Sequence, residues 1–356
     1  MNRKQPRSGS FPTCAVEAIV KQVLVVRPEK IEFVDAIEPE LGPRDVRLVI
    51  THSGLSSRSE IERYQRNYAG KPEPIGYNMV GVVDRIGADV SSVSVGDRVY
   101  SSAGHADIVV VDERKVIKLP NGVDDESGCF AYLPTLGTHA LRLAGYKAGE
   151  FVAIIGQGII GQSAALMALL FGARTIVVDI SNDRLQRARD HGVHLALNPL
   201  EDDLNAAIAD FCGPAGLDIV IDTASSWRSL ALGLDLIRTR GRVVELGIIR
   251  DAPTPEETGV FFESYRRNMH GKEAVLIGAS NDLSDPEGLT GQRFTRERNI
   301  EEVLSHVATG ALDLGQLITH RYPIEGIETV YQALLNGGGK EHLGVVFTWP
   351  AAEANG

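Results

Sequence analysis

Three glycines and one aspartate in the middle of the chain have the residue types and spacing needed to bind a dinucleotide. Gly156, Gly158 and Gly161 form a G-x-G-x-x-G pattern directly after the short apolar run Phe151–Ile155. In such a pattern the first glycine permits a tight turn, the second lets backbone approach a pyrophosphate, and the third lets a helix pack closely on a strand. Asp179 lies 23 residues after Gly156, close to the roughly 20 expected of an acid that binds the adenosine ribose.

The acid also predicts which nicotinamide cofactor binds. A carboxylate accepts hydrogen bonds from both ribose hydroxyls and repels a 2′-phosphate, so Asp179 favours NAD over NADP. Arg184 is an ambiguous neighbour, because an arginine there can hold a 2′-phosphate or cover the adenosine side of NAD; we expect the second. Ile159 and Ile160 should place helix N-terminal amides at the pyrophosphate, where the helix dipole favours negative charge.

The elements around these residues predict an α/β fold with a doubly wound parallel sheet. A helix is expected over residues 158–172, and a second strand, Arg174–Val178, should end at Asp179. Further strands are expected at His194–Leu197, Leu217–Asp222, Arg242–Leu246 and Ala274–Gly278, with a helix at Ser226–Thr239. Alternation of this kind indicates about six strands in a Rossmann-type domain. At the strand ends, Thr223 should face the adenosine side, and the nicotinamide should be lined by Leu246, Gly247 and Ile248.

Both ends of the chain predict a second, β-rich domain. Patches of alternating apolar residues, broken by Pro and Gly, run from Cys14 towards residue 120. The last strand, Gly344–Thr348, cannot form a sheet alone and should return to this N-terminal β-structure. We therefore expect a disordered leader at 1–13, a discontinuous catalytic domain at 14–139 and 280–356, and an NAD-binding domain at 140–279. The active site should lie in the cleft between the two domains.

Composition narrows the class of protein. The chain has 356 residues, a net charge of −11 and 43% apolar residues, which suits about two domains and argues against nucleic-acid or membrane-surface partners. Its longest apolar run, 164–173, is about half a membrane span. The three cysteines are scattered, so a cytoplasmic protein with reduced thiols is expected.

Several short motifs, in this order and spacing, resemble the medium-chain dehydrogenase/reductase family, best known for zinc alcohol and polyol dehydrogenases. Besides the glycine turn they are Gly81–Val83, Gly96–Val99, Val116–Pro120, Gly137–Leu141 and Leu317–Leu334. The resemblance extends over residues 14–349. It implies a GroES-like β-barrel catalytic domain beside the Rossmann domain, a small-molecule substrate, and a homodimer or homotetramer.

The chain departs from this family where zinc members hold their metal. Ser56 stands at the position of the cysteine ligand, and Tyr77 and Asn78 replace the histidine and the acid that follows it. The third ligand would fall near Tyr132 or Leu133, and the lobe that carries four cysteines is absent after Gly96–Val99. Because zinc binds thiolate, imidazole or carboxylate groups, we expect no zinc in this protein.

A side chain must then move the hydroxyl proton that zinc would otherwise activate. Tyr77 and His105 are the two candidates for this general acid and base, alone or together, although each could instead be an ordinary wall or core residue. Ser56, Arg58 and Asn78 are candidates for substrate binding, and a cation at Arg58 could hold a carboxylate or phosphate. Two nearby acids, Glu60 and Glu62, are expected on a solvated helix face.

These features together favour an NAD-dependent, zinc-independent oxidoreductase that interconverts a secondary alcohol and its ketone. A sugar, a cyclitol or a specialised metabolite would fit as the substrate. Two alternatives stay open. A zinc-free enoyl or quinone reductase of this family would mostly prefer NADPH, which Asp179 opposes. A protein that binds NAD without catalysis would keep Asp179 and the glycines but would need no polar pocket.

Overall fold

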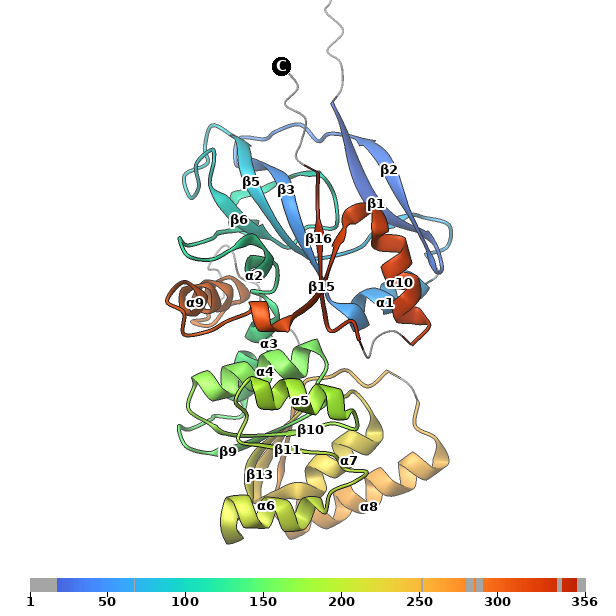
Figure 1. Cartoon of the computed structure of the whole chain (residues 1–356), viewed down its shortest axis with the longest axis vertical. Coiled ribbons are helices and arrows are strands. Elements are labelled where there is room, and N and C mark those ends of the chain that lie inside the picture. Colours follow the sequence, from blue (N-terminus) through green and yellow to red (C-terminus); the bar gives the residue numbers. More distant parts are fainter. Residues whose placement is uncertain are drawn as a thin grey trace, which may run out of the picture.

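The computed structural model describes residues 18–66, 68–250, 252–279, 285, 291–337 and 341–350. They form two parts that lie end to end along the longest axis of the molecule, each built around its own β-structure (Figure 1). The expected leader at 1–13 lies outside the described residues. The candidate site lies where the two parts meet.

One part is a six-stranded parallel sheet covered by helices. The strand order is β11-β10-β9-β12-β13-β14, with all neighbours parallel. The strands are β9 Phe151–Ile155, β10 Arg174–Val178, β11 Leu195–Leu197, β12 Leu217–Asp222, β13 Ile237–Glu245 and β14 Val275–Gly278. The helices are α4 Ile159–Leu170, α5 Asn182–Asp190, α6 Leu204–Cys212, α7 Trp227–Leu236 and α8 Pro255–Gly271. This order confirms the predicted doubly wound sheet. Successive strands are added to one side of β9 and then, from β12 on, to its other side, and folds of this kind bind ligands at that switch point.

One predicted boundary in this part is wrong. The helix expected to reach Thr239 ends at Leu236, and β13 begins at Ile237. Ile237 has extended backbone angles, is buried, and pairs with Leu217 of β12. Burial against the neighbouring strand therefore decides the conformation of a β-branched residue that the helical pattern had included.

The other part is a mostly antiparallel β-structure from both ends of the chain, in which only β15 and β16 pair in parallel among the described strands. A seven-stranded sheet has the order β15-β16-β3-β5-β6-β8, with β7 paired to β3, and a three-stranded sheet has the order β2-β1-β4. The strands are β1 Ile19–Arg27, β2 Lys30–Ile37, β3 Asp45–Leu55, β4 Glu73–Pro74, β5 Asn78–Ile86, β6 Arg98–Ser101, β7 Ile108–Asp112, β8 Val116–Lys118, β15 Ile318–Pro323 and β16 Gly344–Thr348. The final strand β16 returns to the N-terminal β-structure, as the sequence predicted, and it pairs there antiparallel to β3 (Figure 1).

Helices join the two parts. After β3, α1 Ser57–Gln65 packs near α10 Ile327–Leu335, while α2 Asp125–Cys129, α3 Leu133–Leu143 and α9 Arg296–Ala308 lie at the junction. Helix α3 packs closely on α4, because a Cβ added to its Gly137 would lie 2.6 Å from the Cα of Ala164. The largest apolar core is continuous across this contact, from Val80 of β5 to Ile154 of β9. The junction therefore fixes how the two walls of the cleft face each other.

Two further expectations concern the whole molecule. Within the described ranges, no helix combines the length and apolar character that crossing a membrane requires. Cys129 and Cys212 are buried free thiols, and Cys14 lies outside the described residues. Burial raises the pKa of both described thiols, so neither is a reactive thiolate near neutral pH.

Candidate active site and cofactor cleft

The three glycines after β9 have the geometry that their predicted roles require. Gly156 has a φ of +88°, in the region that L side chains rarely adopt. A Cβ on Gly161 would lie only 1.8 Å from the carbonyl oxygen of Gly156, so a side chain cannot fit there. A Cβ on Gly158 would meet nothing within 4 Å, and this residue caps the N-terminus of α4. The turn thus leaves open space in front of the helix amides, where a pyrophosphate can bind.

These contacts predict opposite effects for two matched glycine substitutions. Gly161→Ala should lower the free energy of unfolding by about 1–3 kcal/mol, because the new methyl group overpacks the turn. Gly158→Ala should leave the free energy of unfolding nearly unchanged but weaken dinucleotide binding, since its methyl group enters the open space. Urea denaturation without cofactor and fluorescence titration with NADH measure the two effects. Equal stability of both variants would contradict this account of the turn.

Asp179 is held in a fixed orientation at the end of β10. One carboxylate oxygen accepts from the backbone N–H of Gln157 at 2.6 Å, and the other accepts from that of Ser181 at 2.8 Å. Nη1 of Arg184 lies 3.9 Å from the first of these oxygens. A carboxylate has about four acceptor sites, so further sites on Asp179 are available for ribose hydroxyls.

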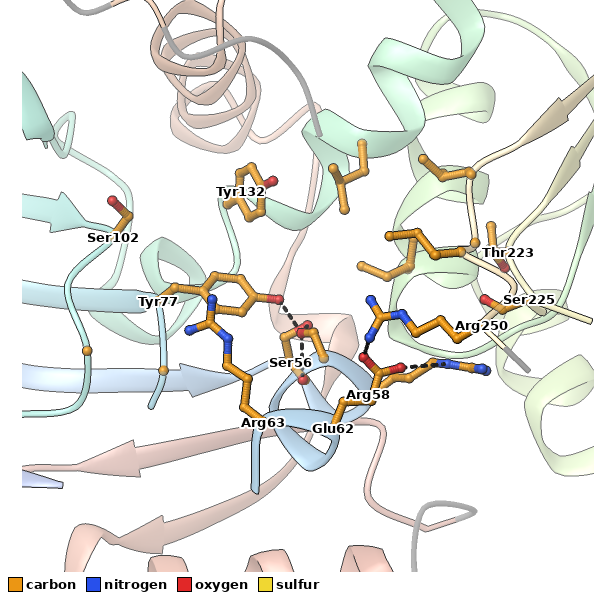
Figure 2. Close-up of a pocket in the computed structure, with 18 of the residues that line it drawn as sticks. Ser56, Arg58, Glu62, Arg63, Tyr77, Ser102, Tyr132, Thr223, Ser225 and Arg250 are labelled. Carbon is orange, nitrogen blue, oxygen red and sulfur yellow. Dashed lines mark hydrogen bonds and ion pairs between the residues drawn. The ribbon is translucent and has the colours of Figure 1, made fainter. Parts of the chain in front are cut away.

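A pocket of about 770 Å³ lies between the two parts of the molecule. Residues around α1 and β5 form one wall, and the turns after β12 and β13 form the other (Figure 2). The pocket brings together eight residues that the sequence singled out: Ser56, Arg58, Tyr77, Ile160, Thr223, Leu246, Gly247 and Ile248. Thr223 lines the pocket, and its hydroxyl donates to the carbonyls of Ile155 and Gly156 at 3.0 and 2.9 Å; that it faces the adenosine side stays a prediction.

Three hydroxyl groups meet on the α1 wall of the pocket. The Tyr77 hydroxyl lies 2.8 Å from Oγ of Ser59, which in turn donates to Oγ of Ser56 at 3.2 Å (Figure 2). Burial, and then the carboxylate of Glu60, raise the pKa of Tyr77, and the two serine hydroxyls and the Arg63 cation oppose this rise. The phenol is therefore neutral and able to donate a proton at neutral pH.

The other candidate for proton transfer, His105, lies behind the pocket wall. Its side chain has no exposed surface. Its Nδ1 is 2.9 Å from Oγ of Ser53, and its Nε2 is 3.3 Å from Oε2 of Glu60. A direct catalytic role for His105 stays a prediction. Its contacts favour a supporting role instead, in which His105 orients the carboxylate of Glu60.

Glu60 is not on a solvated helix face, and that prediction is wrong. Its side chain is fully buried, accepts from the Ser56 backbone N–H at 2.8 Å and binds the hydroxyl of Tyr331 on α10. Packing of α1 against α10 turns Glu60 and Tyr64, four residues apart, inwards. The buried acid is thus surrounded by donors, as a buried charge must be.

Glu62 lines the pocket, where it binds two arginines. It forms ion pairs with Arg58, four residues before it at 3.8 Å, and with Arg250 from the segment after β13 (Figure 2). Nη1 of Arg58 also donates to the carbonyl of Ala224 at 3.3 Å. The Arg250–Glu62 ion pair and the hydrogen bond from Arg58 to Ala224 both cross the cleft. Arg250 could not be identified as a site residue from the sequence, because only the fold brings its segment to α1.

Asn78 does not line the pocket. It is fully buried at the start of β5, and its Oδ1 accepts from the Tyr100 hydroxyl at 3.4 Å. The same hydroxyl donates to the Tyr77 carbonyl at 3.1 Å. Asn78 therefore lies behind the Tyr77 backbone, and a contact with substrate stays a prediction that this placement does not support.

The residues at the family's metal position do not fit a zinc ion. Ser56, Tyr77, Asn78 and Tyr132 offer hydroxyl and amide groups, whereas zinc binds thiolate, imidazole and carboxylate ligands. Among the residues that the structure describes, no group of three or more His, Cys, Asp or Glu side chains is placed to hold a metal ion.

Comparisons with known proteins identify dehydrogenase domains in both parts of the chain. Residues 42–133 match the alcohol dehydrogenase GroES-like domain, and residues 160–281 match the zinc-binding dehydrogenase domain. A sorbitol dehydrogenase of Halalkalibacterium halodurans is 23% identical over 84% of this chain and 91% of its own length. A D-xylulose reductase of Scheffersomyces stipitis is 26% identical over 87% and 94%.

A solved structure shares the fold over almost the whole chain. Galactitol-1-phosphate dehydrogenase from Escherichia coli superimposes with a TM-score of 0.79 at 22% identity, covering 92% of this chain and 99% of that one. At this identity the match shows the fold alone. Both domain models match in the expected order, and relatives align along most of their length. The chain is a member of the medium-chain dehydrogenase/reductase family.

Proposed function

We propose that this protein is an NAD(H)-dependent, zinc-independent dehydrogenase that interconverts a secondary alcohol and its ketone. The observation that carries the proposal is the Tyr77 hydroxyl, which stands in the cleft pocket at the family's histidine-ligand position and bonds to Ser59. The relatives named sorbitol dehydrogenase and D-xylulose reductase support a sugar or polyol as substrate. A cyclitol or a specialised metabolite offers the same chemical group.

Residues on both walls of the pocket have separate tasks in this reaction. NAD, when bound, supplies the acceptor or donor of the hydride. The glycine turn would hold its pyrophosphate, Asp179 its adenosine ribose, and the chain from Leu246 to Ile248 the nicotinamide end.

Tyr77 moves the proton. In reduction its neutral phenol donates a proton to the ketone oxygen while the carbonyl carbon receives the hydride, which gives the alcohol. In oxidation the phenolate takes the hydroxyl proton as the hydride leaves. Ser59 and Ser56 can stabilise the phenolate by hydrogen bonding, which lowers the pKa of Tyr77. The positive charge of Arg63 also lowers this pKa.

Metal analysis combined with chelation tests the zinc-independent part of this proposal. Protein purified without added metal should contain zinc well below one ion per chain, because the pocket lacks zinc ligands. Its turnover of the secondary alcohol that it oxidises should change neither with a chelator nor with added zinc. A sorbitol dehydrogenase that binds zinc serves as the positive control. Activity that chelation abolishes and zinc restores would refute the proposal.

A further inference from the structure

We propose that the substrate carries an anionic group, a carboxylate or a phosphate, which Arg63 and Arg66 bind at a distance from the reacting carbon. This inference rests on the proposed function, because it names the substrate class of the same pocket. The step that it adds is electrostatic, and it depends on which charged groups line the pocket and which of them already have partners.

Positive charge is concentrated in the pocket of an otherwise acidic protein. The chain has a net charge of −11. The pocket is nevertheless lined by five arginines and two acids, namely Arg58, Arg63, Arg66, Arg250, Arg296, Glu62 and Glu73. A cleft with charge of one sign and low-dielectric walls focuses its field and raises the local concentration of oppositely charged ligands. The pocket is therefore suited to an anion.

Three of the five arginines are engaged by the protein itself. Arg58 and Arg250 both pair with Glu62, so this acid is already shared between two cations. The guanidinium of Arg296 lies over the ring of Tyr132, 5.3 Å from its centroid. These contacts explain why the three side chains stay in the wall of the pocket.

Arg63 and Arg66 differ from the other three. Among the described residues, neither side chain has a hydrogen-bond or ion-pair partner, and Glu73 is not within ion-pair distance of either. They lie at the last turn of α1 and at its C-cap, where a cation also interacts favourably with the helix dipole. That interaction explains cations at a helix end, but it does not explain why both line the pocket beside Tyr77.

The position of Arg63 connects anion binding to the reaction. Arg63 is close enough to Tyr77 to lower the pKa of its hydroxyl, and Figure 2 shows both side chains directed into the same pocket. A substrate whose oxygen meets Tyr77 would thus place its far end near Arg63 and Arg66. Two guanidinium groups present planar donor forks, which match carboxylate and phosphate oxygens.

A binding experiment with matched probes tests the inference. The protein is first saturated with NADH, so that the site for the cofactor's own phosphates is filled. Binding of D-fructose, D-fructose 6-phosphate and 5-keto-D-gluconate is then measured by calorimetry, which separates a neutral, a phosphorylated and a carboxylated ketone. At least one anionic probe should bind more than about tenfold tighter than fructose, since charge-assisted hydrogen bonds are the strong ones. The ratio of the two anionic probes tells which anion the site prefers.

Three variants locate the anion site. Arg63→Gln and Arg66→Gln should each weaken binding of the preferred anion about tenfold or more and leave fructose binding unchanged. Arg66 is the cleaner test, because it is not among the charges that shift the pKa of Tyr77. Arg240→Gln is the matched control: it removes the same charge from an exposed residue that pairs with Glu273 outside the pocket, and it should change nothing.

Each outcome decides between the inference and the proposed function. Equal binding of neutral and anionic probes, no binding of either anion, or equal weakening by the Arg240 variant overturns the anion site. NADH oxidation followed in the same samples reports hydride transfer separately. Turnover of the probes, with anion binding that is insensitive to both Arg63→Gln and Arg66→Gln, would overturn the anion site and leave the dehydrogenase. Arginine-dependent anion binding without turnover of any probe would keep the anion site and count against the dehydrogenase.

Discussion

Replacement of Tyr77 by phenylalanine is expected to lower the rate of hydride transfer by about 10²–10⁴-fold, the usual contribution of a general acid or base. The substitution keeps the ring, which packs edge-on against Tyr132, and removes only the hydroxyl that donates the proton. The affinity for NADH and the free energy of unfolding should therefore stay close to those of the wild type. Single-turnover reduction of a ketone, with NADH fluorescence as the signal, measures the effect.

Tyr132→Phe is the matched control for this substitution. Its ring centroid lies 6.0 Å from that of Tyr77, and it lines the same pocket. It also stands near the family's third ligand position, so it is the nearest competing phenol. The variant should retain most of its activity. Loss of activity in Tyr132→Phe, with activity kept in Tyr77→Phe, would transfer the proton-donating role to the neighbouring phenol.

The direction of the pKa shift adds a pH test of the same group. Burial raises the pKa of Tyr77 above its ordinary value near 10, so the phenol stays protonated through neutral pH. Reduction needs this protonated form and should fall only at alkaline pH, whereas oxidation needs the phenolate and should rise over the same range. In Tyr77→Phe both dependences should disappear from the chemical step.

The sequence predicted the sheet around the cofactor turn well because its signals are local. Strands β9, β10 and β12 are short runs rich in buried Ile and Val, as expected of strands covered on both faces of a parallel sheet. The glycine turn was equally readable, since its spacing follows from steric limits within six residues. The return of β16 to the N-terminal β-structure followed from a physical requirement, because an isolated strand leaves its backbone groups without partners.

The candidate site was predicted less completely because its polar contacts join distant segments. Glu60 was expected on a solvated face, since a charged residue in a short helix is usually exposed. Its burial depends on Tyr331 of α10 and on His105, neither of which is near it in sequence. The same holds for Arg250, which meets Glu62 only after both parts have folded. Such partners become readable only when the tertiary structure is known.

Asp179→Asn is expected to shift cofactor preference away from NADH by about 10²-fold, because charge-assisted hydrogen bonds contribute roughly 1.5–3 kcal/mol each. Asparagine keeps one oxygen that can accept from the Gln157 or Ser181 backbone N–H, so the turn should stay folded. It removes the negative charge, which lowers the affinity for NADH and relieves the repulsion of a 2′-phosphate. Fluorescence titration with NADH and NADPH, on wild type and variant, gives the ratio of affinities.

Arg184→Gln separates the charge of Asp179 from that of its neighbour. The Arg184 guanidinium lies 3.9 Å from the Asp179 carboxylate, and in the variant Asp179→Asn it is the nearby cation that would attract a 2′-phosphate. If Arg184 instead covers the adenosine of NAD, its loss should weaken NADH and NADPH binding alike. If Arg184 holds the 2′-phosphate, the double variant of Asp179 and Arg184 should lose most of the NADPH affinity that Asp179→Asn gains. An unchanged cofactor ratio in Asp179→Asn would mean that the acid does not face the ribose, and its role would be confined to bracing the glycine turn.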